Sequence, residues 1–127
     1  MSDPRVGTTV THRRYVHHGD AHYGGGLVDG AFSLKLFGDV ATELCIRTDG
    51  DEGLFAGYAE VRFLDAVRAG DVLEVSAELV RVGRRSREVA FEARVVCRAR
   101  PEVSPSASAA LDPPLVVTRA TGTVVVP

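Results

Sequence analysis

The feature that most constrains this chain is one long apolar segment, residues 31–47, which follows a loop containing three consecutive glycines, Gly24 to Gly26. Its apolar residues recur at helical spacing. Asp29 is a good N-cap, and Thr48-Asp49-Gly50 supplies a stop signal. The sequence therefore predicts a helix from about Asp29 to Arg47. No other stretch predicts a long helix, so the remaining elements must cover this one.

Three carboxylates accompany this helix: Asp29, Asp39 and Glu43. At about 100° per residue they fall within about 80° of one another, on a side shared with large apolar residues. Further apolar residues on the other sides predict that the helix is buried nearly all round. A buried carboxylate needs a partner or a chemical role. The ordinary alternatives are an ion pair between Glu43 and Arg47, spaced i to i+4, and a simple N-cap at Asp29.

Five further segments predict β-strands, because apolar and β-branched residues alternate with polar ones. They are a first strand within residues 6–16, three runs between residues 55 and 97, and a final run at 115–126. Short turns at Ala69–Asp71 and Val82–Ser86 predict that neighbouring strands are antiparallel. The segment 98–114 contains four prolines and predicts an irregular crossing.

The order strand, helix, four strands has one economical packing solution. It is an antiparallel β-sheet of about five strands wrapped around one long central helix, an α+β arrangement known as the hotdog fold. We expect a single domain over residues 1–127. The edge strands of such a sheet are left open, which predicts a homodimer formed by sheet extension.

Composition excludes several classes of protein. The net charge of −2 gives no reason to expect nucleic acid as a partner. No stretch of 18 uninterrupted apolar residues or signal-like N-terminus is present, so we expect no membrane association and a cytoplasmic location. Cys45 and Cys97 lack metal or redox spacing and are expected to be reduced core thiols. The four histidines lie in the first quarter of the chain without metal-site spacing, so no metal is expected.

Three short segments together suggest a family. His22-Tyr23-Gly24-Gly25, Leu27–Ala31 and Leu36–Leu44 closely resemble the small hotdog ammonia lyases that act on 3-aminoacyl-CoA thioesters, the 3-aminobutyryl-CoA and β-alanyl-CoA ammonia-lyases. The resemblance extends from Ala21 to the C-terminus. It departs at Gly26, where the family loop has Asn.

This resemblance implies a carbon-nitrogen lyase that reversibly eliminates ammonia from a 3-aminoacyl-CoA to give the 2-enoyl-CoA. Coenzyme A is then part of the substrate, and no separate cofactor is expected. The family also implies a homohexamer built as a trimer of dimers. The difficult step is removal of a proton from the carbon beside the thioester carbonyl, which requires a base and donors for the enolate oxygen.

The residues offer both requirements. Burial would raise the pKa of the helix carboxylates, so Glu43 and Asp39 are the predicted acid/base pair. His22 and Tyr23 are predicted to contact the thioester or to deliver a proton to the leaving amine. Backbone N–H groups near the helix start could hold the enolate oxygen. The predicted substrate-binding residues of this region are Gly24, Gly25, Gly26 and Asp29, whose carboxylate would bind the ammonium group.

A basic turn offers a second binding feature. Arg84, Arg85 and Arg87 place three guanidinium groups within four residues, which suits the phosphates of coenzyme A. A solvated basic turn is the ordinary alternative.

Other functions stay open at this point. An acyl-CoA thioesterase would use the same fold, glycine loop and helix carboxylate, followed by attack of water. A noncatalytic acyl-thioester binding protein is kept open by Gly26. The enzyme could also run in the addition direction, joining an amine to an enoyl thioester.

Overall fold

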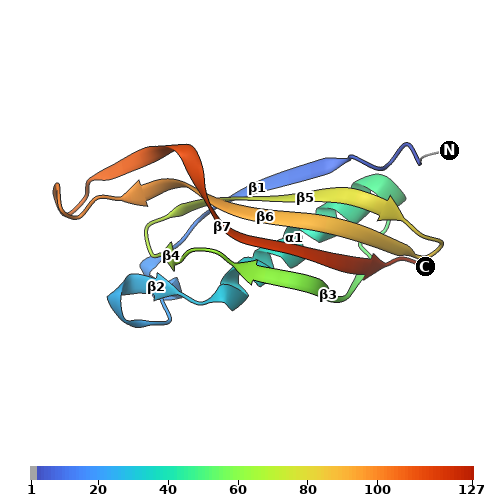
Figure 1. The fold of residues 1–127 in the computed structure, drawn as a ribbon, viewed down its shortest axis with the longest axis horizontal. Coiled ribbons are helices and arrows are strands. Elements are labelled where there is room, and N and C mark those ends of the chain that lie inside the picture. Colours follow the sequence, from blue (N-terminus) through green and yellow to red (C-terminus); the bar gives the residue numbers. More distant parts are fainter. Residues whose placement is uncertain (1–2) are drawn as a thin grey trace.

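A computed structural model describes residues 3–127 of the chain (Figure 1). It contains one long helix and seven strands. In chain order the elements are β1 (Thr9–Tyr15), β2 (Leu27–Val28), α1 (Gly30–Asp49), β3 (Leu54–Phe63), β4 (Val67–Arg68), β5 (Val72–Val82), β6 (Ser86–Ala99) and β7 (Ser108–Val125). The predicted helix and first strand are present, and α1 continues two residues beyond the predicted end at Arg47.

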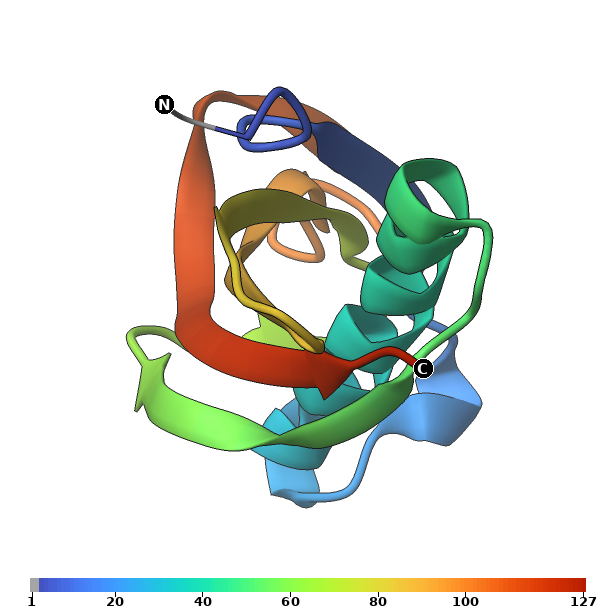
Figure 2. The same ribbon diagram turned by 90° about the vertical axis from the view of Figure 1, so that its right-hand side faces the viewer.

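Five strands form one antiparallel sheet in the order β1-β5-β6-β7-β3. Viewed along the long axis, the sheet curls around α1 (Figure 2). A separate pair, β2 and β4, lies beside the start of the helix. The predicted hotdog architecture is confirmed, with β1 and β3 as the two edge strands of the sheet.

The core lies between α1 and the concave face of the sheet. Phe37 on the helix stacks on Phe91 of β6, with ring centroids 4.9 Å apart. Along the helix the buried residues recur three or four positions apart, as expected for one buried face. They are Ser33, Leu36, Phe37, Val40, Ala41, Leu44 and Cys45.

The opposite face of α1 is open to solvent. Asp39 is exposed, and Ile46 retains 51% of its accessible surface. The prediction that the helix is buried nearly all round is therefore wrong for the single chain. A sheet can cover only one side of a helix, and no second layer within residues 3–127 lies over the other side.

The segment 98–114 is more regular than predicted. β6 runs on to Ala99, and β7 begins at Ser108 and pairs with it, so most of the segment is a long hairpin. Pro113 and Pro114 fall where the β6–β7 register shifts between Val95 and Cys97. A register shift releases ladder hydrogen bonds, so it tolerates residues without an N–H.

Cys45 and Cys97 are free thiols, the first buried and the second partly buried. In residues 3–127, no helix is both long and apolar enough to span a bilayer. The same residues contain no cluster of three or more His, Cys, Asp or Glu side chains suited to a metal ion.

Candidate functional site

A cavity of about 410 Å³ lies at the N-terminal end of α1. Its wall combines apolar side chains with carboxyl, hydroxyl and phenol groups. The lining residues come from the glycine loop, the first helical turn, the segment after β3, and β7. They are Tyr23, Val28, Asp29, Gly30, Ser33, Phe63, Leu64, Asp65, Ala66, Val67 and Thr118.

The glycine loop lies beside this cavity. Gly24–Gly26 form a single tight turn, and Gly25 and Gly26 have φ values of +74° and +73°. Side chains disfavour that left-handed conformation, so two of the three glycines are required by the backbone. Tyr23 lines the cavity and keeps 57% of its surface exposed. The ring of His22 stands edge-on to it at 4.7 Å. The loop therefore brings the predicted Tyr23 and His22 together near the cavity.

Asp29 occupies the N-cap position of α1 but makes no side-chain cap hydrogen bond. Asp29 is one of the residues that line the cavity. A simple capping role does not account for this arrangement, because a capping carboxylate accepts a hydrogen bond from a first-turn N–H. The first turn of α1 thus presents its helix dipole without a side-chain cap from Asp29.

Three polar residues of the cavity were not predicted from the sequence: Ser33, Asp65 and Thr118. Ser33 had a weak signal, since it is a polar residue on the apolar face of the helix, one turn after Asp29. Asp65 follows the second predicted strand in a turn, where acids are common. Thr118 had no signal, because threonine is ordinary in a strand.

Glu43 lies elsewhere on the helix. From the rise per residue of an α-helix, Glu43 lies about 20 Å along the axis from Gly30. Asp39 lies about 13 Å along the axis from Gly30. One Glu43 carboxylate oxygen is 2.8 Å from His12 Nε2 on β1, and the other accepts a hydrogen bond from Arg47 Nε at 2.8 Å. Within one chain, neither Glu43 nor Asp39 shares a site with the glycine loop.

The electrostatics of Glu43 also differ from the prediction. Its side chain is 37% exposed, and the hydrogen bond from Arg47, followed by that from His12, lowers the pKa of the carboxyl below its ordinary value. The expected rise in pKa by burial is wrong for the single chain, because the exposed position leaves little desolvation to oppose these partners. The i to i+4 ion pair with Arg47 is present.

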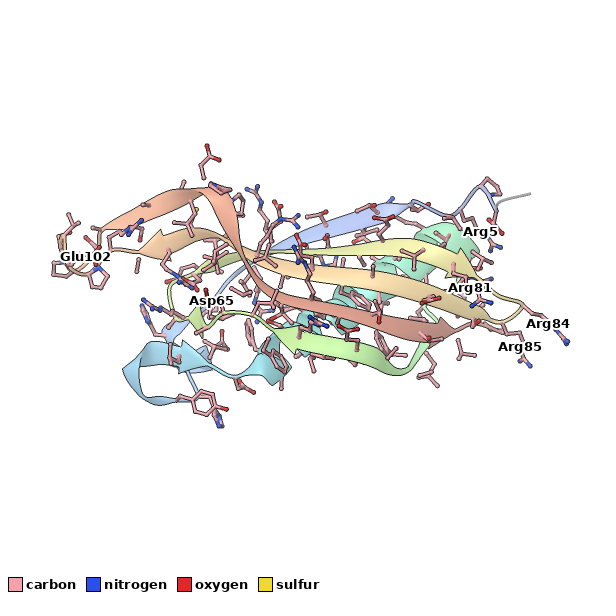
Figure 3. All side chains as sticks on the ribbon, viewed as in Figure 1. Arg5, Asp65, Arg81, Arg84, Arg85 and Glu102 are labelled. Atoms are coloured by element: carbon pink, nitrogen blue, oxygen red, sulfur yellow. The ribbon has the colours of Figure 1, made fainter. Side chains whose placement is uncertain are left out.

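The basic turn divides into two kinds of arginine. Arg84 and Arg85 are exposed at the tip of the β5–β6 turn, at the far end of the long axis from Asp65 (Figure 3). Arg87 is only 5% exposed. Its guanidinium donates to both carboxylate oxygens of Asp49 and to the carbonyls of Gly83 and Ser86. Arg87 thus has its donors engaged within the chain, whereas Arg84 and Arg85 extend outward.

A larger cavity, of about 530 Å³, lies on the face of the sheet away from α1. Most of its charged side chains are already paired, in the Glu60–Arg62 and Glu92–Arg119 ion pairs. It lies away from the glycine loop and the helix start. We therefore take the smaller cavity at the start of α1 as the candidate active site.

Comparisons with known proteins agree with this architecture. A family model described as the thioesterase superfamily matches residues 25–96. The chain is 56% identical to the 3-aminobutyryl-CoA ammonia lyase of Acetoanaerobium sticklandii over 108 residues, which are 85% of this chain and 86% of that protein.

Solved structures give a second comparison. β-Alanyl-CoA:ammonia lyase from Clostridium propionicum is similar with a TM-score of 0.90 and 36% identity, covering 95% of this chain and 86% of that one. A hexameric hotdog fold thioesterase of Campylobacter jejuni has a TM-score of 0.73 at 19% identity, covering 89% and 78%. The second likeness concerns the fold alone.

The chain belongs to the thioesterase superfamily and, within it, to the family of the ammonia lyase of Acetoanaerobium sticklandii. The resemblance noted in residues 22–44 is thereby confirmed. The similar proteins named here are two ammonia lyases, whose names give 3-aminobutyryl-CoA and β-alanyl-CoA, and one thioesterase.

Proposed function

We propose that this protein is a carbon-nitrogen lyase that reversibly eliminates ammonia from a 3-aminoacyl-CoA, such as 3-aminobutyryl-CoA or β-alanyl-CoA, to give the 2-enoyl-CoA. The observation that carries this function is the 56% identity with an ammonia lyase over 85% of the chain. The Campylobacter jejuni thioesterase is 19% identical to this chain, which supports only a shared fold.

The cavity at the start of α1 would hold the reacting end of the substrate. The thioester carbonyl would face the N–H groups of the Gly24–Gly26 turn and the first helical turn, where the helix dipole favours a developing enolate oxygen. Asp29 would bind the substrate ammonium. Tyr23 and His22 would contact the thioester, because a substrate ammonium leaves as ammonia and needs no added proton. Two observations support these roles: the Asp29 carboxylate makes no N-cap hydrogen bond, and Tyr23 is exposed.

A homodimer formed through β3 would bring separated residues together. β3 is an edge strand, and its first and last residues, Leu54 and Phe63, are 77% and 58% exposed. Two antiparallel copies of β3 would set the start of one strand beside the end of the other, covering both side chains. Trimerisation of such dimers would give the hexamer that the family resemblance implies.

The same pairing gives Arg84 and Arg85 a route to the substrate. Arg85 and Leu54, at the start of β3, line one shallow pocket, and Phe63, at the end of β3, lines the cavity. Antiparallel pairing of β3 would therefore place Arg85 near the cavity of the other subunit. Arg84 and Arg85 would then bind phosphates of coenzyme A. Arg87 was predicted with them, and we assign it to holding the turn through Asp49. No cofactor other than this substrate group enters the proposal.

Asp39 and Glu43 remain the proposed acid/base pair. Because of their distance from the start of α1 in one chain, they would have to act on a substrate held by a neighbouring subunit. Glu43→Gln and Asp39→Asn test this assignment. We expect at least one of them to lose about 100-fold in kcat. Near-native turnover in both variants would end the assignment without affecting the proposed reaction.

The reaction itself is tested with purified protein, crotonyl-CoA and ammonium. We expect loss of the enoyl-thioester absorbance without release of free thiol, together with the mass of an ammonia adduct. Thiol release would instead indicate thioester hydrolysis. An unchanged enoyl signal without thiol release would favour a binding role. A cytoplasmic location, where acyl-CoA substrates are available, is part of the same proposal.

Arg84→Ala and Arg85→Ala test the phosphate site. The double variant should raise the KM for crotonyl-CoA about tenfold, as expected when charge-assisted contacts are lost. Arg81→Ala is a matched control, because this arginine lies on β5 near the same turn (Figure 3). An equal effect of Arg81→Ala would indicate general electrostatic attraction in place of a specific site.

A further inference from the structure

Buried polar side chains are few in this chain, and they fall into two kinds. Among residues 3–127, the buried polar or charged residues are Ser33, Asp71, Arg87 and Thr118. Asp71 is paired with Arg98 at 2.9 Å, and Arg87 with Asp49 at 2.7 Å. The other two, Ser33 and Thr118, have no ion-pair partner, and both line the cavity at the start of α1.

The hydroxyl groups of Ser33 and Thr118 differ from other hydroxyls of the helix. Thr42 and Thr48 donate to the carbonyls of Gly38 and Leu44 one turn earlier. No comparable hydrogen bond is found for Ser33 or Thr118 within the described chain. Side-chain oxygens sealed from solvent all have partners in residues 3–127. Ser33 and Thr118 are just 1% and 2% exposed, and both line the cavity.

The fold holds these two residues close to the same point. Gly30, the first residue of α1, lies directly on the ring of Phe63, where an added Cβ would overlap ring atoms. Phe63 is the register partner of Thr118 in the β3–β7 ladder. Ser33 is three residues after Gly30 and so lies above it on the same helix face. The first turn of α1, which carries Ser33, therefore begins close to the Phe63–Thr118 pair.

We propose that Ser33 and Thr118 form, with the Asp29 carboxylate, a subsite for the amine nitrogen of the substrate. This inference rests on the proposed function and adds its specificity. A primary ammonium has three N–H donors, and two hydroxyl oxygens and one carboxylate oxygen supply three acceptors. In elimination the C–N bond breaks, nitrogen keeps the electron pair and leaves as ammonia, and the proton of the adjacent carbon passes to the base.

A subsite of this kind would distinguish aminoacyl thioesters from simple ones. Acyl-CoA substrates without an amine would leave two buried hydroxyls and a carboxylate without a partner, which disfavours their binding. In the addition direction, the same three groups would accept hydrogen bonds from the three N–H groups of ammonia, whose free electron pair forms the new bond to the enoyl carbon. The remaining wall, with Val28, Phe63 and Val67, would accommodate the hydrocarbon part of the acyl group.

The test compares Thr118→Val with Thr118→Ser, which remove and keep the hydroxyl, alongside Ser33→Ala. In the addition assay we expect Thr118→Val and Ser33→Ala to raise the KM for ammonium about tenfold or more, with the KM for crotonyl-CoA changed less than about twofold. Thr118→Ser should retain the low KM for ammonium. Ser76→Ala, in the cavity on the other face of the sheet, is the matched control.

Equal increases in both KM values, or no change in either, would overturn the subsite. If Thr118→Val does not fold, as judged by cooperative thermal unfolding, Ser33→Ala decides on its own. If the wild-type protein shows no lyase activity, the proposed function fails separately, and binding competition between β-alanyl-CoA and propionyl-CoA still decides the subsite. A wild-type preference for β-alanyl-CoA that Ser33→Ala abolishes supports it, and equal affinities for the two thioesters refute it.

Discussion

The polar groups at the two ends of α1 differ in whether they have partners within the chain. At the C-terminal end, Gly50 takes a left-handed conformation and donates its N–H to Ile46 O at 2.9 Å. Asp49 accepts hydrogen bonds from Arg87 and from Arg5. At the N-terminal end, Asp29 makes no side-chain cap, and its carboxylate opens onto a cavity.

This difference separates structural polar groups from functional ones. At the C-terminal end the charged partners of Asp49 belong to the chain itself, so the interactions contribute to folding. At the N-terminal end Asp29, Ser33 and Thr118 line a cavity, and we expect a ligand to supply the partners of their polar groups. The following predictions test that division, from the largest expected effect to the smallest.

Replacing Arg87 should have the largest effect on folding. Arg87→Met leaves the Asp49 carboxylate, 9% exposed, with only Arg5 as a charged partner. Breaking a buried ion pair leaves an uncompensated charge, and we expect a loss of about 3 kcal/mol in the free energy of unfolding. Urea titration measures it. Arg84→Met on the exposed turn should change stability by less than about 0.5 kcal/mol, and equal losses in both variants would contradict the division.

A methyl group at the other end of the helix should destabilise by packing. In Gly30→Ala the new Cβ would overlap the ring of Phe63, so the helix start or the ring must move. The ring is the far end of a side chain that is 58% exposed, so it can turn aside, and we expect a loss of about 1 kcal/mol. Gly24→Ala is the control, since nothing lies within 4 Å of the position its new methyl group would take and its φ is ordinary. Thermal unfolding measures the midpoint of each variant. Equal midpoints would contradict the close approach of Gly30 to Phe63.

Acid should weaken the C-terminal end of α1. The hydrogen bond from Arg87 lowers the pKa of Asp49 below its ordinary 3.8. As the pH falls, the Asp49 carboxyl is therefore protonated in the unfolded chain before it is protonated in the folded one. The stabilisation that the ionised carboxylate gives the folded state is complete above about pH 4 and is lost as the pH falls through the lower folded pKa. Unfolding measured at pH 7, 4 and 3 should show a shallower loss in Asp49→Asn than in the wild type. Parallel curves would assign the acid loss to other carboxylates.

The smallest effect is expected midway along the helix. The His12–Glu43 pair joins side chains that are 38% and 37% exposed, and exposed ion pairs contribute little to stability. His12→Gln should shift Tm by less than about 2 °C. A larger shift would show that Glu43 is held by the fold as firmly as Asp49.

The fold was largely predictable from local patterns. Period-two alternation marked the strands, and the run from Ala31 to Arg47 marked the helix, because both patterns report which side of each element is apolar. The hairpin beyond Arg98 was missed, since prolines argue against a strand unless a register shift accommodates them. That shift depends on pairing with β6, which no local pattern records.

The candidate site was predicted only in part. Tyr23, His22, the glycines and Asp29 form a contiguous loop, so a sequence motif could find them together. Glu43 and Asp39 were grouped with them by helical angle alone, which ignores the distance along the axis. Thr118 lies far away in the sequence and reaches the cavity only through its pairing with Phe63.

By itself, the sequence determined which elements form, where the glycine loop meets the helix, and which family the chain resembles. These properties follow from residues near one another in the chain, whose spacing sets their conformation. The tertiary structure decided which polar groups pair with each other within the chain and which belong to residues that line the cavity. That outcome depends on contacts between distant residues, such as Asp49 with Arg87 and Gly30 with Phe63, and on the cavity that those contacts leave at the start of the helix.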